Sequence, residues 1–239
     1  MKDKVVIVTG GSRGIGAATA ALLASAGARV AIASRTATEL EATARVIATQ
    51  SGAEQVLAVP TDVAEERSVV GLFEAVVARF GDLDVLVNNA GVFSGGDFAD
   101  LTTEAWDRVQ AVNVRGAFLA SREAFRRFRA LGHGGAIVNV SSLGGVHGTE
   151  KFPGFAAYTV SKFGVIGLTE TLAVEGRPHD IRVNCVAPGA VETAMKKEAA
   201  PFLRTRTTPE DVARVIRFLC DDEESGALTG AIVEIHSNL

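Results

Sequence analysis

A tyrosine and a lysine four residues apart are the pair in this sequence best suited to proton transfer. Tyr158 and Lys162 lie in a stretch with a helical pattern, so their side chains share one face, one turn apart. A free tyrosine has a pKa near ~10, too high for efficient acid–base work at neutral pH. An ammonium ~4 Å away favours tyrosinate by about 4 kcal/mol at an effective dielectric constant of ~20. We therefore expect Lys162 to lower the pKa of Tyr158, although a lone tyrosine on a helix also occurs as a packing residue.

A glycine-rich turn follows the first apolar run of the chain. Val5–Thr9 leads directly into Gly10-Gly11-Ser12-Arg13-Gly14-Ile15-Gly16, and an alanine-rich stretch follows. Glycines permit positive φ and a close approach of a pyrophosphate, and the start of a helix offers free N–H groups. The spacing differs from the common dinucleotide fingerprint. Its place after a first strand still favours phosphate binding over a tight turn without a ligand.

The end of the second apolar run indicates which dinucleotide the chain prefers. NAD sites usually carry Asp or Glu at this point to bind the ribose 2′-hydroxyl. Here Ser34-Arg35-Thr36 ends the run without an acid. Arg35 suits a bidentate contact with a 2′-phosphate, and Arg13 in the glycine turn adds a second positive charge. The sequence therefore favours NADP(H) over NAD(H), with a solvated loop charge as the alternative for Arg35.

The order of the elements predicts how these residues are positioned. Short β-branched runs alternate with longer helical stretches, which indicates right-handed βαβ crossovers and a doubly wound parallel sheet, a Rossmann fold of about seven strands with helices on both faces. No linker or repeat interrupts the pattern, so residues 1–239 are expected to form a single domain. The expected strands are Val5–Thr9, Arg29–Ala33, Gln55–Val59, Asp84–Asn88, Ala136–Val140, Ile181–Val186 and Ala231–Ile235, and the expected helices are Gly14–Ala26, Thr38–Gln50, Glu65–Phe80, Thr103–Leu131, Ala156–Glu175 and one that begins at Pro209.

Composition argues against several other classes of protein. The chain has 24 Lys and Arg against 28 Asp and Glu, a formal net charge of −4, so no basic excess points to nucleic acid or an anionic membrane. Its first residues are too few for a signal peptide, and no apolar run reaches the roughly 18–20 residues of a membrane span. The histidines lack metal-ligand spacing. With Cys185 and Cys220 both in apolar stretches, we expect a cytoplasmic protein without a metal site.

Four motifs occur in an order and rough spacing typical of one family. They are the Thr9–Gly16 turn, Asn88-Asn89-Ala90-Gly91, Asn139-Val140-Ser141-Ser142 and Tyr158-Thr159-Val160-Ser161-Lys162. Over nearly its whole length the chain resembles the short-chain dehydrogenase/reductase family, and its architecture is similar to that of 3-oxoacyl-acyl-carrier-protein reductases. The resemblance implies an oxidoreductase that acts on CH–OH groups and the corresponding carbonyls, and Arg13 and Arg35 favour NADP(H) as its cofactor.

The resemblance also implies roles for individual residues. Tyr158 matches the general acid–base, Ser142 the serine that binds the substrate oxygen, and Lys162 the lysine that also holds the nicotinamide ribose. Asn113 matches an asparagine that anchors a water between that lysine and solvent. The residues that match cofactor-binding positions, besides Tyr158 and Lys162, are Gly10, Ser12, Arg13, Gly14, Ile15, Gly16, Ser34, Arg35, Asp62, Val63, Asn89, Ala90, Gly91, Pro188, Gly189, Val191 and Thr193.

Three regions leave the substrate and the assembly open. The loop Leu143–Ala157 is longer than in the usual family member and carries Glu150-Lys151-Phe152-Pro153 near the expected substrate mouth. A 3-oxoacyl thioester and a small ketone both remain as substrates. The segment from Gly189 to about Thr208 is expected to be a lid, with a plain surface connection as the alternative. The long helices suggest a homodimer or homotetramer, while the ending Glu234–Asn238 differs from the family's common one.

Two other functions remain as alternatives on the same fold. A catalytically silent sensor would bind the cofactor without turnover, and a lyase would be expected to lack the lysine or the nucleotide loop. A sensor has no need to keep Asn113, Ser142, Tyr158 and Lys162 together. Turnover of NADPH with a panel of ketones separates these alternatives from an active reductase.

Overall fold

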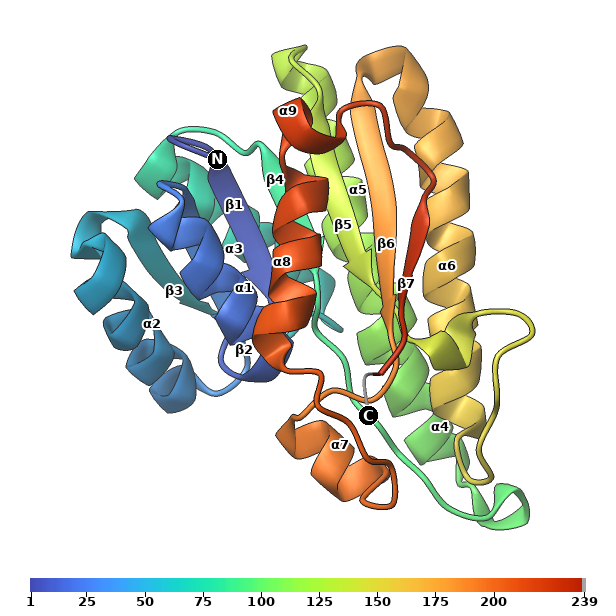
Figure 1. Ribbon diagram of the computed structural model, residues 1–239. Helices are drawn as coiled ribbons and strands as arrows, with labels where there is room; N and C mark the ends of the chain where they lie inside the picture. The colour runs from blue at the N-terminus through green and yellow to red at the C-terminus, as the bar shows by residue number, and fades with distance from the viewer. Residues whose placement is uncertain (238–239) are drawn as a thin grey trace.

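The protein, seen here as a computed structural model that describes residues 1–237, is built on one seven-stranded parallel sheet (Figure 1). The strand order is β3-β2-β1-β4-β5-β6-β7. The order reverses between β1 and β4, as in a doubly wound sheet. This confirms the predicted fold class, and each strand lies within two residues of its expected bounds. The strands are β1 (Val5–Thr9), β2 (Arg29–Ser34), β3 (Val56–Pro60), β4 (Val85–Asn88), β5 (Gly135–Val140), β6 (Ile181–Pro188) and β7 (Ile232–Ile235).

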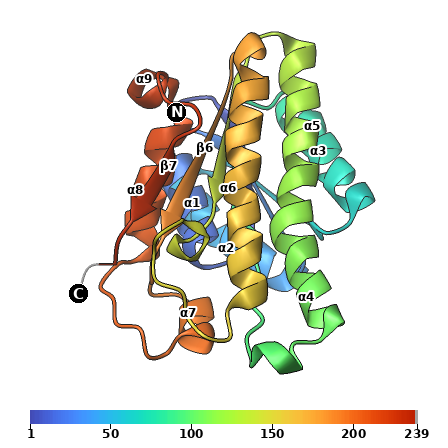
Figure 2. The same ribbon diagram turned by 90° about the vertical axis from the view of Figure 1, so that its right-hand side faces the viewer.

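Helices cover both faces of the sheet (Figures 1 and 2). One apolar cluster joins α1, α2 and α8 to one face, and a second joins α3, α5 and α6 to the other. Within β1, Val6 and Val8 face the first cluster whereas Val5 and Ile7 face the second. Both sides of the strand are buried, which explains its uninterrupted apolar sequence. The helices are α1 (Gly14–Ser25), α2 (Ala37–Ser51), α3 (Glu66–Phe80), α4 (Thr103–Gln110), α5 (Gly116–Leu131), α6 (Ala156–Gly176), α7 (Ala194–Ala199), α8 (Pro209–Cys220) and α9 (Asp222–Ser225).

The long helix expected over Thr103–Leu131 is interrupted at its centre. A π-helical turn, Ala111–Arg115, separates α4 from α5. Such a turn places one extra residue in the helix and commonly occurs at functional sites. Asn113 lies in the middle of this turn, with 2% of its surface exposed.

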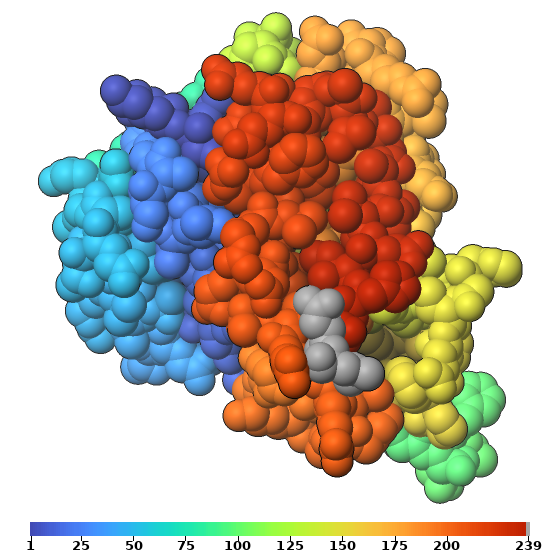
Figure 3. Space-filling view, viewed as in Figure 1, coloured from blue at the N-terminus to red at the C-terminus, as the bar shows by residue number. Residues whose placement is uncertain are grey.

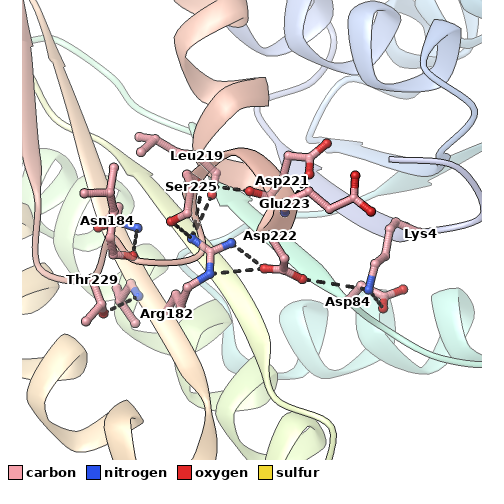
Figure 4. Close-up of polar contacts among 12 residues, drawn as sticks. Lys4, Asp84, Arg182, Asn184, Leu219, Asp221, Asp222, Glu223, Ser225 and Thr229 are labelled. Atoms are coloured by element: carbon pink, nitrogen blue, oxygen red, sulfur yellow. Dashed lines mark hydrogen bonds and ion pairs between the residues drawn. The ribbon is translucent and has the colours of Figure 1, made fainter.

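A polar cluster ties the chain together at the amino ends of the strands (Figure 4). The Arg182 guanidinium, at the start of β6, lies 2.6 Å from a carboxylate oxygen of Asp222 and donates to the carbonyls of Leu219 and Ser225 at 3.3 Å. Lys4 binds Asp84 at 2.9 Å in the same region. Because the arginine side chain is only 11% exposed, its contacts are shielded from solvent.

Arg182→Ala is expected to lower the free energy of unfolding by about 1–3 kcal/mol, because it leaves shielded acceptors without a donor. Chemical denaturation measures this change. Arg126→Ala is the matched control, since its ion pair with Glu123 is 61% exposed on the arginine side and is expected to contribute less than about 1 kcal/mol. Equal destabilisation by the two variants would contradict the structural role of the Arg182 cluster.

Candidate active site

A cleft of about 800 Å³ opens at the carboxyl ends of the strands. Its lining joins the glycine turn after β1, the ends of β2, β4 and β5, the start of α6, and α7. It lies where the strand order reverses between β1 and β4. Ligands of open parallel sheets bind at this place, because the loops on either side diverge there.

The glycine turn is packed so closely that side chains are excluded from it. Gly10 has φ of +66°, and a Cβ there would lie 2.8 Å from the Cα of Ala90. A Cβ on Gly16 would lie 2.3 Å from the Gly10 carbonyl oxygen. The Asn89 amide holds the turn in place by donating to the carbonyls of Thr9 at 3.0 Å and Gly10 at 3.1 Å. The turn is therefore a rigid, bare backbone surface beside the cleft.

The residues around this turn fit a phosphorylated dinucleotide. Helix α1 starts at Gly14 without a side-chain cap, and Gly14 and Ile15 line the cleft, so the first N–H groups of the helix are available for a phosphate there. The Oγ atom of Ser34 is buried and has no hydrogen-bond partner within the described part of the chain. Ser34 lines the cleft together with Arg13 and Arg35. An unpartnered hydroxyl and two guanidinium groups on the lining of one cleft suit a ribose phosphate.

Lys162 is almost completely buried, with 4% of its surface exposed. Its ammonium donates to the Val140 carbonyl at 2.9 Å, which fixes the side chain at the end of β5. Burial lowers the pKa of Lys162 from 10.5 to about 8. The nitrogen lies 5.5 Å from the centre of the Tyr158 ring. Lys162 is therefore mostly charged at neutral pH and loses its charge in mildly alkaline solution.

The pKa of Tyr158 differs from the value expected from its spacing to Lys162. Burial raises its pKa above the usual 10.0, and a hydrogen bond with the Ser142 hydroxyl offsets only part of that effect. The expected net lowering of the Tyr158 pKa was wrong, because the cost of desolvating a tyrosinate exceeds the effects that stabilise it. At neutral pH the phenol therefore keeps its proton and is set up to donate it.

Asn113 organises the backbone behind this pair. Its side chain accepts from the Val92 N–H at 2.8 Å and donates to the Val92 carbonyl at 3.0 Å and to Ser161 at 2.9 Å. A Cβ on Gly91 would lie 3.5 Å from the Asn113 side-chain oxygen and 3.6 Å from the lysine nitrogen. Asn113 thus positions the segment after β4 against Lys162, and both N–H groups of its side-chain amide are used in doing so.

Nearly all the residues that the sequence singled out line the same cleft. Two do not: Gly16 packs beneath the glycine turn, and Asn113 lines a small cavity behind the cleft with Thr9 and Val165. The lining includes Gly10, Ser12, Arg13, Gly14, Ile15, Ser34, Arg35, Asp62, Val63, Asn89, Ala90, Gly91, Ser142, Tyr158, Lys162, Pro188, Gly189, Val191 and Thr193.

Other lining residues were not predicted. Glu39, in the first turn of α2, and the aromatic residues Phe93 and Phe155 also line the cleft. His236 and Ser237 reach it from the end of β7, where Ser237 donates to the Ala190 carbonyl at 3.0 Å. The divergent ending therefore contributes to the cleft itself, and its last expected residue, Asn238, lies outside the described residues. The only sequence signal for the two aromatic residues was the loop Leu143–Ala157, which contains Phe155 and was expected near the substrate mouth.

The segment expected to be a lid borders the cleft. Helix α7 and the turn after it contribute Met195, Leu203 and Arg204 to the lining. A lid would have to occupy this position beside the cleft. That the segment moves to open and close the cleft stays a prediction. Across residues 1–237, no helix is long and apolar enough to span a membrane. In the same residues no three His, Cys, Asp or Glu side chains are grouped as metal ligands.

Comparison with known proteins links this site to a family. The family model described as short chain dehydrogenase matches residues 4–203. A trans-4-hydroxycyclohexanecarboxylate dehydrogenase of Sinomonas cyclohexanicum is 39% identical over 98% of this chain and 91% of its own length. A solved structure of levodione reductase superposes with a TM-score of 0.91 at 31% identity, covering 98% of this chain and 96% of that one. A 3-ketoacyl-(acyl-carrier-protein) reductase from Brucella melitensis, complexed with NADH, gives 0.88 at 32% identity, covering 98% and 97%.

Proposed function

Because the chain belongs to the short-chain dehydrogenase family, we propose that it is an NADP(H)-dependent oxidoreductase that interconverts a carbonyl and a secondary alcohol. One observation carries the proposal: Tyr158, hydrogen-bonded to Ser142 and beside the buried ammonium of Lys162, lies in the same cleft as the glycine turn. A proton donor is thereby placed next to a dinucleotide site, which is the arrangement that hydride chemistry requires.

The cofactor would lie across the reversal of strand order. The bare glycine turn and the start of α1 would receive the pyrophosphate, and Arg13 and Arg35 the 2′-phosphate of the adenosine ribose. Pro188, Gly189, Val191 and Thr193 line the side of the cleft nearest α7 and would border the nicotinamide. When bound, the nicotinamide supplies or accepts the hydride.

Side chains of this protein carry out the proton transfer. In reduction, the carbonyl carbon gains a C–H bond, the C=O π electrons move to oxygen, and that oxygen takes the phenolic proton of Tyr158. Ser142 donates a hydrogen bond to the same oxygen, as an oxyanion donor does. The Lys162 charge stabilises the tyrosinate left behind until solvent returns the proton. The raised pKa of Tyr158 keeps the phenol protonated at neutral pH, which favours reduction there.

The relatives support a secondary alcohol or ketone as the reacting group. One is named for a hydroxylated cyclohexanecarboxylate and another for a 3-ketoacyl group on a carrier protein, so they share the reacting centre but differ in what surrounds it. The second was solved with NADH, and the acidic side chain of Glu39 also lines the cleft of this chain. The proposed preference for NADP(H) over NAD(H) therefore rests on Arg13 and Arg35.

We also propose that the chain works as a homodimer or homotetramer in the cytoplasm. Phe118 on α5 and Phe163 and Val174 on α6 are 42%, 39% and 60% exposed, respectively. Apolar side chains on two neighbouring long helices support burial against a second copy. Light scattering of the purified protein measures the mass of the assembly.

Steady-state kinetics with NADPH and with NADH test the cofactor and the reaction together. The wild type is expected to reduce simple ketones with a KM for NADPH at least about tenfold below that for NADH. Arg35→Ala removes a charge-assisted contact that contributes roughly 1.5–3 kcal/mol, and is expected to raise the NADPH KM by about tenfold to a hundredfold while changing the NADH KM little.

Arg45→Ala, an α2 arginine that does not line the cleft, is the matched control and is expected to leave both values unchanged. Equal effects of Arg35→Ala on the two cofactors would contradict the 2′-phosphate contact. Binding of NADPH without turnover of any ketone would contradict the oxidoreductase and favour a silent sensor.

A further inference from the structure

A continuous row of aromatic rings runs outward from the catalytic tyrosine. Phe93, Phe152 and Phe155 line the cleft, and we refer to these three side chains as the aromatic wall. Phe93 and Phe155 have ring centroids 4.7 Å apart, and they lie 5.6 Å and 6.4 Å from the Tyr158 ring. Phe152 follows at 5.8 Å from Phe155. The surface next to the proton donor is therefore apolar over the length of several rings.

A fourth ring joins the two segments that border the cleft. Phe202, in the turn after α7, packs edge-on against Phe152 with centroids 5.7 Å apart. The loop ahead of α6 (yellow) descends toward the α7 region (orange) in Figure 2, and the two form neighbouring parts of the lower end of the molecule in Figure 3. A long substrate that left the cleft between these segments would have to separate the Phe152–Phe202 contact.

The loop that carries Phe152 is held in shape by its own hydrogen bonds. The Lys151 ammonium donates to the carbonyls of Val146 at 2.7 Å and Thr149 at 3.0 Å, and to the Thr149 hydroxyl at 2.6 Å. The Thr149 hydroxyl in turn donates to the Val146 carbonyl at 3.0 Å. These contacts fold residues 146–151 back on themselves, so Phe152 is presented by a braced loop. The loop ahead of α6 therefore forms a wall of the cleft that is held in shape by its own hydrogen bonds.

We propose that the substrate is a compact alicyclic ketone, or the corresponding secondary alcohol, with a ring of about cyclohexane size packed on the aromatic wall. The inference rests on the proposed oxidoreductase function and specifies its substrate class. Aromatic rings offer broad apolar contact but no hydrogen bonds for the amide groups of a thioester carrier arm. A saturated ring also loses less internal freedom on binding than an open chain of the same carbon number.

The chemistry at the ring is that of the proposed function. The ring carbonyl carbon gains a hydride from the cofactor, its C=O becomes C–OH, and the proton comes from Tyr158. One ketone and one reduced cofactor with one proton give one alcohol and one oxidised cofactor. Phe93 and Phe155 hold the ring beside the phenol, which fixes the carbonyl oxygen relative to Tyr158 and Ser142.

Reduction of cyclohexanone, 2-hexanone and acetoacetyl-coenzyme A with NADPH tests the inference. The wild type is expected to show kcat/KM at least about tenfold higher for cyclohexanone than for the other two. Phe152→Ala is expected to lower kcat/KM for cyclohexanone by about tenfold or more and that for 2-hexanone by less than about threefold. Phe202→Ala should shift the same ratio in the same direction. Phe98→Ala, with 72% of its surface exposed and no part in the cleft, is the control and should leave the ratio unchanged.

The possible failures are distinguishable. A wild type that reduces 2-hexanone or the thioester as well as cyclohexanone, or a Phe152→Ala variant that weakens all three equally, would overturn the alicyclic substrate class while leaving the oxidoreductase intact. If no ketone is reduced, the oxidoreductase fails, and calorimetry of the NADPH-loaded wild type then decides the inference. Cyclohexanol is expected to bind at least about tenfold more tightly than 2-hexanol, and equal affinities would overturn it.

Discussion

Tyr158→Phe is expected to lower kcat for ketone reduction by about 1,000-fold while leaving the affinity for NADPH within about twofold. The estimate follows from the usual contribution of a positioned general acid, roughly 100-fold to 10,000-fold. Tyr158 is the only tyrosine of the chain, and its hydroxyl interacts with Ser142. The ring itself packs against Phe93 and Phe155, contacts that a phenylalanine retains. The substitution therefore removes the proton and little else.

Single-turnover absorbance at the reduced nicotinamide band measures the rate, and fluorescence titration measures NADPH binding. Ser142→Ala provides a graded comparison, because it removes one hydrogen bond to the substrate oxygen and is expected to cost about 100-fold, as loss of a single oxyanion donor does. A Tyr158→Phe variant with more than about a tenth of the wild-type rate would show that another group supplies the proton, and the mechanism would fail.

The fold could be predicted because each strand is buried on both sides. Val5–Thr9 contains no charged residue because both faces of β1 pack against apolar helices, so the sequence signal is uninterrupted. The observed strand ends differ from the predicted ones by a residue or two where strands extend into the site. Strand β6, for example, continues past Val186 to Pro188, which pairs with Ile235. A proline is tolerated at the end of a strand, but its presence in a sequence does not predict that a strand continues to it.

The interruption of the long helix at Asn113 could not be predicted from local sequence. Residues 103–131 carry a good helical pattern, and the π-helical turn depends on distant partners: the backbone of Val92 after β4 and the Ser161 hydroxyl on α6. These contacts satisfy the asparagine side chain inside the protein. The family resemblance identified Asn113 as a site residue. Its physical role, supporting the segment beside Lys162, is visible only in the tertiary structure.

Electrostatics and specificity were the least predictable parts of the site. The spacing of Tyr158 and Lys162 correctly put both side chains in one cleft, but it could not say how far each is removed from water. Desolvation reversed the expected direction for the tyrosine pKa. In the same way, the aromatic wall is assembled from residues 93, 152 and 155, with Phe202 against its outer edge, and no pattern in the sequence links these positions.

Reduction is expected to slow as the pH rises through about 8, because Lys162 then loses its charge. Its pKa is lowered by burial from 10.5 to about 8, so the ammonium is present below that pH and absent above it. Tyr158 keeps its proton over this interval, since its pKa is raised above 10.0. A positive charge 5.5 Å from the centre of the tyrosinate ring stabilises it by about 3 kcal/mol at an effective dielectric constant of ~20. The rate above pH 8 is therefore expected to fall toward a plateau roughly 100-fold lower.

Lys162→Met is expected to show that low plateau at every pH, with no step near pH 8, because methionine fills the buried site without a charge. Measuring kcat/KM for both proteins from pH 6 to 10 gives two curves that differ by about 100-fold at pH 7 and converge in alkali. Lys197→Met, which removes an exposed lysine of α7 that does not line the cleft, should reproduce the wild-type curve. A step near pH 8 that persists in Lys162→Met would assign the titration to another group and remove the lysine charge from the mechanism.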